Sequence, residues 1–294
     1  MLEAVNISHT FHRSSPFSRQ VLDGISLNLA PGETVLLTGP SGSGKTTLAR
    51  VLAGLIQPTM GTVRLNGSDL HATVGKRMPT PKLVVLTSQY PERQFFANTV
   101  WEELSWGLRV GLGMGMAEVR QRVNMISADL AFPLPELADR PPRSLSSGQQ
   151  RKAALVSMLA LEPQVLILDE PLAGLNARER SRLLELLRQW PNKDRTMLVV
   201  AHELELFLGW VQRVAVMASG RLVFLDSPSE LCQTTDTAVR EAIALPPLGE
   251  LSYYLKKSGM SEGPVSIDSS IVRMQLKEAL ARLRASLAKG GSSF

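Results

Sequence analysis

Residues 39–47 read GPSGSGKTT and lie between the apolar run TVLLT and the helix-like segment LARVLAGL. Gly39 to Thr46 fit the pattern G-x-x-x-x-G-K-[ST] in full, in which glycines let backbone N–H groups wrap phosphates. In such a loop Lys45 is suited to reach the outer phosphates, and the Thr46 hydroxyl is suited to bind Mg²⁺. The stretch therefore predicts a nucleotide-binding loop, formed by Gly39, Pro40, Ser41, Gly42, Ser43, Gly44, Lys45, Thr46 and Thr47.

The segment after this loop has the apolar periodicity of a helix. Four apolar side chains recur at i, i+3, i+4 and i+7, namely Leu48, Val51, Leu52 and Leu55. We expect them to line one helical face against a sheet. The positive N-terminal end of that helix would then lie behind the bound phosphates.

Short runs rich in Val, Leu and Ile alternate with helix-like segments over most of the chain. These runs occupy residues 34–38, 83–87, 165–168 and 196–200. The alternation predicts an α/β fold with a mainly parallel sheet covered by helices on both faces. Near the N-terminus, VLDGISLNLAPGE and GTVRLNGSDL instead predict an antiparallel β-subdomain with glycine turns.

Two further regions have helical patterns. Residues 98–160 predict a helical subdomain, in which AFPLPELADRPPRS forms a proline-broken loop. The sequence SPSEL supplies a candidate capping box with proline at the first helical position, from Ser227, Pro228 and Glu230. We therefore expect a nucleotide domain over 1–226 and a small C-terminal helical region over 227–294.

The last segment of the chain has an amphipathic helical pattern. One face carries Val272, Leu276, Leu280, Leu283 and Leu287. Basic residues lie mostly elsewhere, at Arg273, Lys277, Arg282 and Arg284. A helix packed on its own protein or on a second copy accounts for this pattern, and binding to a membrane surface is the alternative. We expect this region to contribute a dimer contact.

The composition limits where this chain of 294 residues works. No stretch offers the ~20 apolar residues that a membrane span needs. The single Cys232 cannot form an internal disulfide, and the first residues lack the apolar stretch of a secretory signal. We therefore expect a cytoplasmic location, with partners supplying any membrane part. The formal charge of +5 suits an ordinary solvated surface, and an anionic membrane face or nucleic acid is the alternative.

VLILDEP at residues 165–171 forms a second candidate site. Its apolar residues predict a buried strand that delivers Asp169 and Glu170 to its carboxyl end, where ligands bind in such sheets. Asp169 is suited to hold Mg²⁺ through water, and Glu170 is suited to act as general base on the attacking water. Alone, two adjacent acids are equally typical of a solvated turn. Beside a phosphate-binding loop they indicate nucleotide hydrolysis.

SLSSGQQRKAAL at residues 144–155 is by itself only the start of a helix. In this order, however, the motifs resemble those of ABC-type ATPases, a class of P-loop NTPases, because LSSGQ is similar to the family signature LSGGQ. The resemblance implies that Ser146, Gly148 and Gln149 contact the nucleotide of a partner subunit. It also implies ATP and Mg²⁺ as cofactors.

Three more residues take their expected roles from the resemblance. His202 in VVAHE matches the switch histidine of the family, although a histidine at a strand end is often purely structural. Gln89 matches the glutamine that bridges the metal, the water and the transport partner. Phe11 lies where the family keeps an aromatic that stacks on adenine, and a core phenylalanine is an equal alternative. We expect catalytic roles for Glu170, His202 and Gln89, with Gln89 also among the metal ligands.

The match extends to one branch of the family. SQYPERQFFANTVWEEL and ALPPLGELSYYLKKSGM resemble the corresponding segments of ATPases from energy-coupling factor transporters. The resemblance implies a second ATPase subunit, identical or related, together with a transmembrane-coupling subunit and a substrate-binding membrane subunit. It implies ATP-driven import of a vitamin or a transition-metal ion of the cobalt and nickel class, at the cytoplasmic face of the membrane. No nucleic-acid partner is expected.

Two positions depart from the family pattern. Ser147 replaces the first glycine after the signature serine, but it keeps a backbone N–H for phosphate contact. Asn176 replaces an aspartate and loses a charge, but it keeps the ability to cap a helix. Since Lys45, Asp169 and Glu170 are intact, we expect an active ATPase.

Two other classes of function compete with a transporter motor. Family members that act on ribosomes usually carry two cassettes in one chain, and those that act on chromosomes insert a long coiled coil. This chain has neither feature. A scaffold that binds ATP without turnover is disfavoured by the intact Glu170 and His202.

Overall fold

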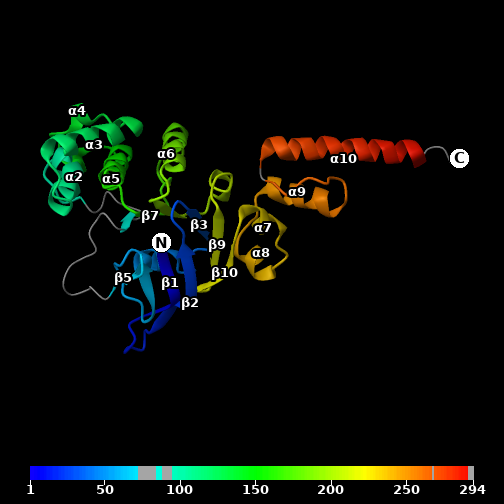
Figure 1. Ribbon diagram of the computed structural model, residues 1–294, viewed down its shortest axis with the longest axis horizontal. Helices are drawn as coiled ribbons and strands as arrows, with labels where there is room; N and C mark the ends of the chain where they lie inside the picture. Colours follow the sequence, from blue (N-terminus) through cyan, green and yellow to red (C-terminus); the bar gives the residue numbers. More distant parts are fainter. Residues whose placement is uncertain (72–83, 88–94, 267, 291–294) are drawn as a thin grey trace.

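The computed structural model describes residues 1–71, 84–87, 95–266 and 268–290. Two sheets lie at the centre, the helices from α2 to α5 lie at one end, and a C-terminal helical region projects at the other (Figure 1). The larger sheet has the strand order β10-β9-β3-β8-β7-β6. Its strands are β3 (Thr34–Thr38), β6 (Val84–Thr87), β7 (Val165–Asp169), β8 (Thr196–Val200), β9 (Arg213–Ala218) and β10 (Arg221–Asp226).

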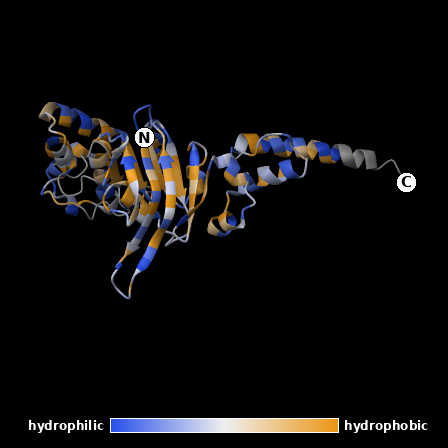
Figure 2. Ribbon diagram, turned by 60° about the horizontal axis from the view of Figure 1, so that its bottom comes forward, coloured by the Kyte–Doolittle hydropathy of each residue, from blue (hydrophilic) through white to orange (hydrophobic). Residues whose placement is uncertain are grey.

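The predicted strands of the main sheet are confirmed over the described residues. β6, β7, β8, β3 and β9 are paired in parallel, and β10 adds an antiparallel edge. Val35 and Leu37 pack into the core on one face of the sheet, and Leu36 packs into the core on the other. Because both faces are covered, the strands are continuous apolar runs rather than alternating ones (Figure 2).

The smaller sheet is antiparallel, with the order β2-β1-β4-β5. It consists of β1 (Leu2–Phe11), β2 (Arg19–Leu29), β4 (Met60–Leu65) and β5 (Ser68–Asp69). This confirms the predicted antiparallel subdomain. The pairing of β1 with β2 places Phe11 opposite Arg19 at one end of the sheet.

Helix α1 (Lys45–Leu52) follows the phosphate-binding loop directly. Leu48, Val51 and Leu52 are buried, as their spacing predicts. The prediction for Leu55 was wrong, because this side chain is 55% exposed. The helix ends at Leu52, and Gly54 adopts a left-handed φ of 75°, which turns the chain before Leu55 can join the apolar face.

The helical subdomain contains α2 (Val100–Trp106), a π-helical turn (Gly107–Gly111), α3 (Met116–Asp129), α4 (Leu134–Leu137), a 3₁₀ turn (Pro142–Ser144) and α5 (Ser147–Leu159). The segment predicted as a proline-broken loop therefore includes the four-residue helix α4. Leu134 and Leu137 are buried, so the packing of these two side chains gives the segment local order.

The remaining helices are α6 (Ala177–Gln189), the 3₁₀ turn Leu204–Leu206, α7 (Pro228–Gln233), α8 (Thr237–Ala242), α9 (Pro247–Lys257) and α10 (Ser269–Gly290). Ser227 caps α7 by accepting from the Glu230 N–H at 3.3 Å, as predicted. The other half of the capping box is absent, because the Ser227 N–H donates to Asp226 at 2.7 Å. None of the helices in the described ranges combines the length and the apolar character needed to cross a bilayer.

Helix α10 buries a different face from the one predicted. Val272 and Ala279 are buried, but Leu280 and Leu283 are 54% and 43% exposed. The buried face also contains Gln275, whose side chain is fully enclosed. A polar residue therefore sits at the centre of the face that meets α9, and two predicted core leucines stay on the surface.

Gln275 is held by two hydrogen bonds. Its Oε1 accepts from the Ser252 hydroxyl of α9 at 2.7 Å, and its Nε2 donates to the Pro264 carbonyl at 2.8 Å. We expect Gln275→Leu to lower the free energy of unfolding by about 1–3 kcal/mol, because it leaves buried polar partners unsatisfied. Urea unfolding measures this loss. Lys277→Ala, at an exposed position of α10, is the control and should change stability by less than about 0.5 kcal/mol. Equal unfolding midpoints for the two variants would contradict the prediction.

Candidate functional site

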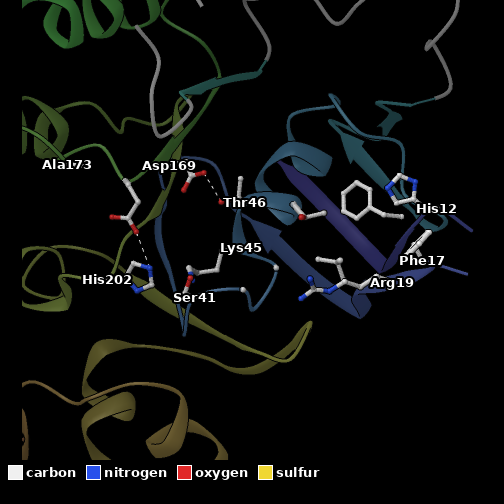
Figure 3. A pocket seen from close by; sticks show the side chains of 15 residues that line it. His12, Phe17, Arg19, Ser41, Lys45, Thr46, Asp169, Ala173 and His202 are labelled. Carbon is white, nitrogen blue, oxygen red and sulfur yellow. Dashed lines mark hydrogen bonds and ion pairs between the residues drawn. The ribbon is translucent and has the colours of Figure 1, made fainter. Parts of the chain in front are cut away.

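The main cavity lies at the carboxyl ends of the parallel strands and has a volume of about 710 Å³. Side chains from the phosphate-binding loop, the end of β7, the segment after β8 and the β1–β2 hairpin meet there (Figure 3). The lining residues are Phe11, His12, Phe17, Arg19, Val21, Ser41, Gly42, Gly44, Lys45, Thr46, Thr47, Asp169, Glu170, Ala173 and His202. The structure therefore brings together most of the residues that the sequence predicts for the nucleotide site.

Two glycines of the loop are required by close backbone approaches. Gly39 has a φ of 140°, and a Cβ there would lie 2.1 Å from the Met217 carbonyl oxygen. Gly44 has a φ of 102°, and a Cβ there would lie 2.8 Å from the Val21 carbonyl oxygen. Neither position can accept a side chain without displacing main chain. Gly39, Pro40 and Ser43 are not among the residues that line the cavity.

The start of α1 offers unpaired donors to the cavity. The first helical bond from the loop is donated by Leu48 to the Gly44 carbonyl at 2.9 Å, and no side chain caps the helix. The N–H groups of Lys45, Thr46 and Thr47 therefore have no acceptor within the helix. Donors of this kind, at the positive end of the helix dipole, suit a phosphate group.

Lys45 lies at the floor of this cavity and is 7% exposed. Its ammonium donates to the carbonyls of Gly39 at 2.8 Å and Pro40 at 2.9 Å. Burial lowers the pKa of Lys45 below its usual value, and the charges of Glu170 and Asp169 oppose this shift. A cation held in this way is available to an anionic ligand, which can replace the loop carbonyls as its partner.

Thr46 and Asp169 form an oxygen pair that fits a magnesium ion. The Thr46 hydroxyl donates to Oδ2 of Asp169 at 2.9 Å (Figure 3). Both groups are hard oxygen ligands, the kind that Mg²⁺ prefers. Within the described ranges no cluster of three or more His, Cys, Asp or Glu side chains is arranged to hold a metal. The remaining ligands of such an ion would therefore come from phosphate oxygens and water, which is the usual pattern for Mg²⁺.

Glu170 faces His202 across the cavity. Oε1 of Glu170 lies 3.4 Å from Nε2 of His202 and accepts no hydrogen bond from any residue that the structure describes, although the atom is shielded from solvent. Burial, reinforced by the charge of Asp169, raises the pKa of Glu170. Burial and the charge of Lys45 lower the pKa of His202, which favours its neutral imidazole. A shielded carboxylate and an imidazole that favours its neutral form can both accept a proton from water.

Comparison with known proteins agrees with this geometry. Residues 22–173 match the ABC transporter family. Over 282 residues the chain is 36% identical to the energy-coupling factor transporter ATP-binding protein EcfA2 of Symbiobacterium thermophilum, with 96% of this chain and 95% of that protein covered. The chain belongs to the ABC transporter ATPase family.

Solved structures of ABC proteins share its fold. The dimeric structure of MJ0796, a bacterial ABC transporter cassette, has a TM-score of 0.71 at 22% identity and covers 78% of this chain and 99% of that chain. CbiO1 of Clostridium perfringens, part of the ABC transporter complex CbiONQ, has a TM-score of 0.64 at 26% identity and covers 78% and 89%. The predicted P-loop ABC fold and the resemblance to energy-coupling factor ATPases are therefore confirmed.

The signature segment of this ABC ATPase opens α5. Ser146 caps the helix and forms a reciprocal pair with Gln149, with bonds of 3.3 Å and 3.0 Å. Ser146, Gly148 and Gln149 do not line the cavity of their own chain. Ser147 is the first residue of α5, so its side chain does not interrupt the helix start.

Asn176 caps α6 as predicted. Its Oδ1 accepts from the Glu179 N–H at 3.0 Å, and Glu179 accepts from the Asn176 N–H at 3.1 Å. The loss of the aspartate charge usual at this position is therefore compatible with an intact helix start. Gln89, the third predicted catalytic residue, lies outside the described residues.

The end of the ABC ATPase cavity that the β1–β2 hairpin lines contains residues that the sequence patterns miss. Phe11 lines the cavity, and His9 packs perpendicular to it with ring centroids 4.5 Å apart. Phe17, which is 81% exposed, and Arg19 line the same end. The only sequence signal for these two was their place in the turn and strand that follow Phe11, because β1–β2 pairing brings them back to it.

Proposed function

We propose that this ABC ATPase hydrolyses ATP to drive an energy-coupling factor transporter that imports a vitamin or a transition-metal ion. The observation that carries the proposal is the arrangement of Glu170 and His202 opposite Lys45 in one cavity. The similarity to EcfA2 of Symbiobacterium thermophilum over 96% of the chain supports the transporter class. The cargo is inferred from the class alone.

Different residues of the chain bind the phosphates, the base and the attacking water. Lys45 and the N–H groups at the start of α1 bind the phosphates, and Phe11 stacks on the base. Glu170 takes a proton from the attacking water, and His202 holds that water or the outer phosphate. Thr46, Asp169 and Gln89 would hold Mg²⁺, which supplies charge neutralisation at the phosphates.

A second ATPase subunit would complete each site. Ser146, Gly148 and Gln149 lie outside their own cavity, and we assign them to the nucleotide of that partner. The ATPase domain spans 1–226 and the C-terminal helical region spans 227–294. The exposed Leu280 and Leu283 of α10 support a dimer contact in the C-terminal region. Closure around two ATP molecules would then drive the membrane subunits.

Isolation of the assembled complex tests this proposal. The tagged chain is purified in detergent from cells that express it at native level, and mass spectrometry identifies the subunits. We expect one further ATPase, or only this one, together with a transmembrane-coupling subunit and a substrate-binding membrane subunit. Recovery of a soluble assembly without membrane subunits would contradict the proposed function.

An exposed aromatic pair on the helical subdomain is the proposed docking point for the membrane partner. Phe96 is 62% exposed and contacts Trp106 edge-on, with ring centroids 5.2 Å apart. Glu103 accepts from the N–H groups of Phe96 and Ala97 at 3.0 Å and 2.9 Å, so it fixes this loop. The anchor is therefore apolar, and Glu103 stabilises the loop rather than offering a free charge. Glu92, another acidic residue that we assign to this docking region, lies outside the described residues.

Phe96→Asp should detach the protein from its membrane partner while ATP binding is retained. Loss of an aromatic anchor costs about 2 kcal/mol or more at an interface, or roughly thirtyfold in affinity. Pull-down by the membrane subunit and a nucleotide-binding assay on the same protein measure the two effects. Leu55→Asp, which changes an exposed leucine beyond α1, is the matched control. Retained assembly of Phe96→Asp would refute the docking role, and lost nucleotide binding would indicate misfolding.

A further inference from the structure

Helix α5 contacts Glu170 and the start of α6 through two consecutive basic residues. Arg151 is 6% exposed, and its Nη2 donates to the backbone carbonyl of Glu170 at 2.6 Å. Lys152 pairs with Oε1 of Glu179 at 2.8 Å. The helix that begins with the signature residues is therefore joined to the residue that follows β7 and to the first turn of α6.

The backbone of Glu170 is unusual for a residue with a side chain. Its φ of 52° lies in the left-handed region, which non-glycine residues rarely adopt. Its N–H donates to the Val200 carbonyl at 2.9 Å, at the end of the strand that leads to His202. Its carbonyl accepts from Arg151 and, at 3.2 Å, from the Ala173 N–H. Hydrogen bonds on both sides of the residue therefore hold a conformation that is costly for glutamate.

We propose that Arg151 is a positioning residue, which orients Glu170 toward the attacking water through the bond to its carbonyl. This role rests on the proposed function of Glu170 as general base. Rotation of the peptide group after Glu170 would change the direction of its side chain, and Arg151 opposes that rotation from a buried position. The orientation of Glu170 thereby depends on the same helix that carries Ser146 and Gln149 toward the partner's nucleotide.

The planar guanidinium is suited to this task. Its N–H groups lie in one plane and can donate to the carbonyl and to other acceptors at the same time, whereas a lysine ammonium has a different shape and reach. A lysine at position 151 would keep the charge that acts on Glu170 but would not reproduce the fork geometry. The substitution Arg151→Lys therefore separates the effect of the charge from the effect of the position.

The test measures ATP turnover and ATP binding for Arg151→Lys and Arg151→Met in the full chain with its co-purified subunits. We expect kcat to fall at least about tenfold in both variants, toward the ~10²-fold loss that a misplacement of about 1 Å causes. The KM for ATP should change by less than about twofold, because no atom of Arg151 lines the nucleotide cavity. Arg122→Met removes an arginine that pairs with Glu118 and Glu162 instead, and this control should keep wild-type kcat.

A double variant distinguishes positioning from a general structural effect. If Arg151 acts through Glu170, then Arg151→Lys should cause no further loss of kcat in a Glu170→Gln background. Wild-type kcat in Arg151→Lys, or losses that multiply in the double variant, would overturn the positioning role. Wild-type turnover in Glu170→Gln alone would instead overturn the proposed base. Thermal unfolding of each variant shows whether the fold is intact. If Arg122→Met lowers both the Tm and kcat as much as the Arg151 variants do, the positioning role is also overturned.

Discussion

Glu170→Gln should slow ATP hydrolysis by roughly 10²- to 10⁴-fold, the contribution that a positioned general base typically makes. The amide has nearly the same shape as the carboxylate, but it cannot take a proton from water. ATP binding should be unchanged, since we assign the phosphate contacts to Lys45 and the start of α1 rather than to Glu170. The purified protein with ATP should therefore accumulate as a closed dimer, which size-exclusion chromatography detects.

The same substitution makes a second prediction about stability. Burial and the charge of Asp169 raise the pKa of Glu170. A carboxyl group with a raised pKa in the folded state binds its proton more tightly there, so its ionised form opposes folding as the pH rises through that range. The neutral amide removes this cost, and the Tm at pH 7 should stay the same or increase.

Glu185→Gln, at an exposed position of α6, is the matched control and should retain wild-type turnover. Unchanged turnover in Glu170→Gln would remove the residue from the catalytic role. A lowered Tm in the same variant would show that its carboxylate stabilises the fold, contrary to the pKa argument.

The phosphate-binding loop and the acidic strand end could be predicted because their signals are local. The glycine and lysine spacing of the loop fixes its chemistry, and the apolar run before Asp169 defines a buried strand. Parallel strands present their carboxyl ends at one edge of the sheet. The loop motif and the strand patterns together therefore predict that Lys45, Asp169 and the strand end before His202 meet at one edge of the sheet.

Contacts that depend on tertiary packing could not be predicted in the same way. The bond from Arg151 to the Glu170 carbonyl joins a helix of one subdomain to a strand end of another. No periodic pattern in the sequence predicts such a contact. Gln275 is buried in α10 because Ser252 and Pro264 supply hydrogen bonds from segments outside the helix. A hydrophobic pattern assigns this position to the surface. Arg19 reaches the cavity through the register of the β1–β2 pair, and Phe17 lies in the turn just before β2.

Lys45→Ala should weaken ATP binding by roughly 10- to 150-fold, the equivalent of the 1.5–3 kcal/mol typical of a hydrogen bond to a charged group. Lys45 is 7% exposed, and its ammonium is held by the carbonyls of Gly39 and Pro40. These neutral partners satisfy its hydrogen bonds but do not neutralise its charge. A phosphate would do both, so the lysine should strengthen binding more than a surface cation could.

Isothermal titration calorimetry with ATP and Mg²⁺ measures the loss, and Lys256→Ala on the exposed side of α9 is the control. The fold of Lys45→Ala should be intact, because burial already disfavours the charged ammonium, as the lowered pKa of Lys45 indicates. A folded Lys45→Ala protein with wild-type affinity would reject the role of the lysine. Phosphate binding would then depend on the backbone N–H groups of the loop and of α1 alone.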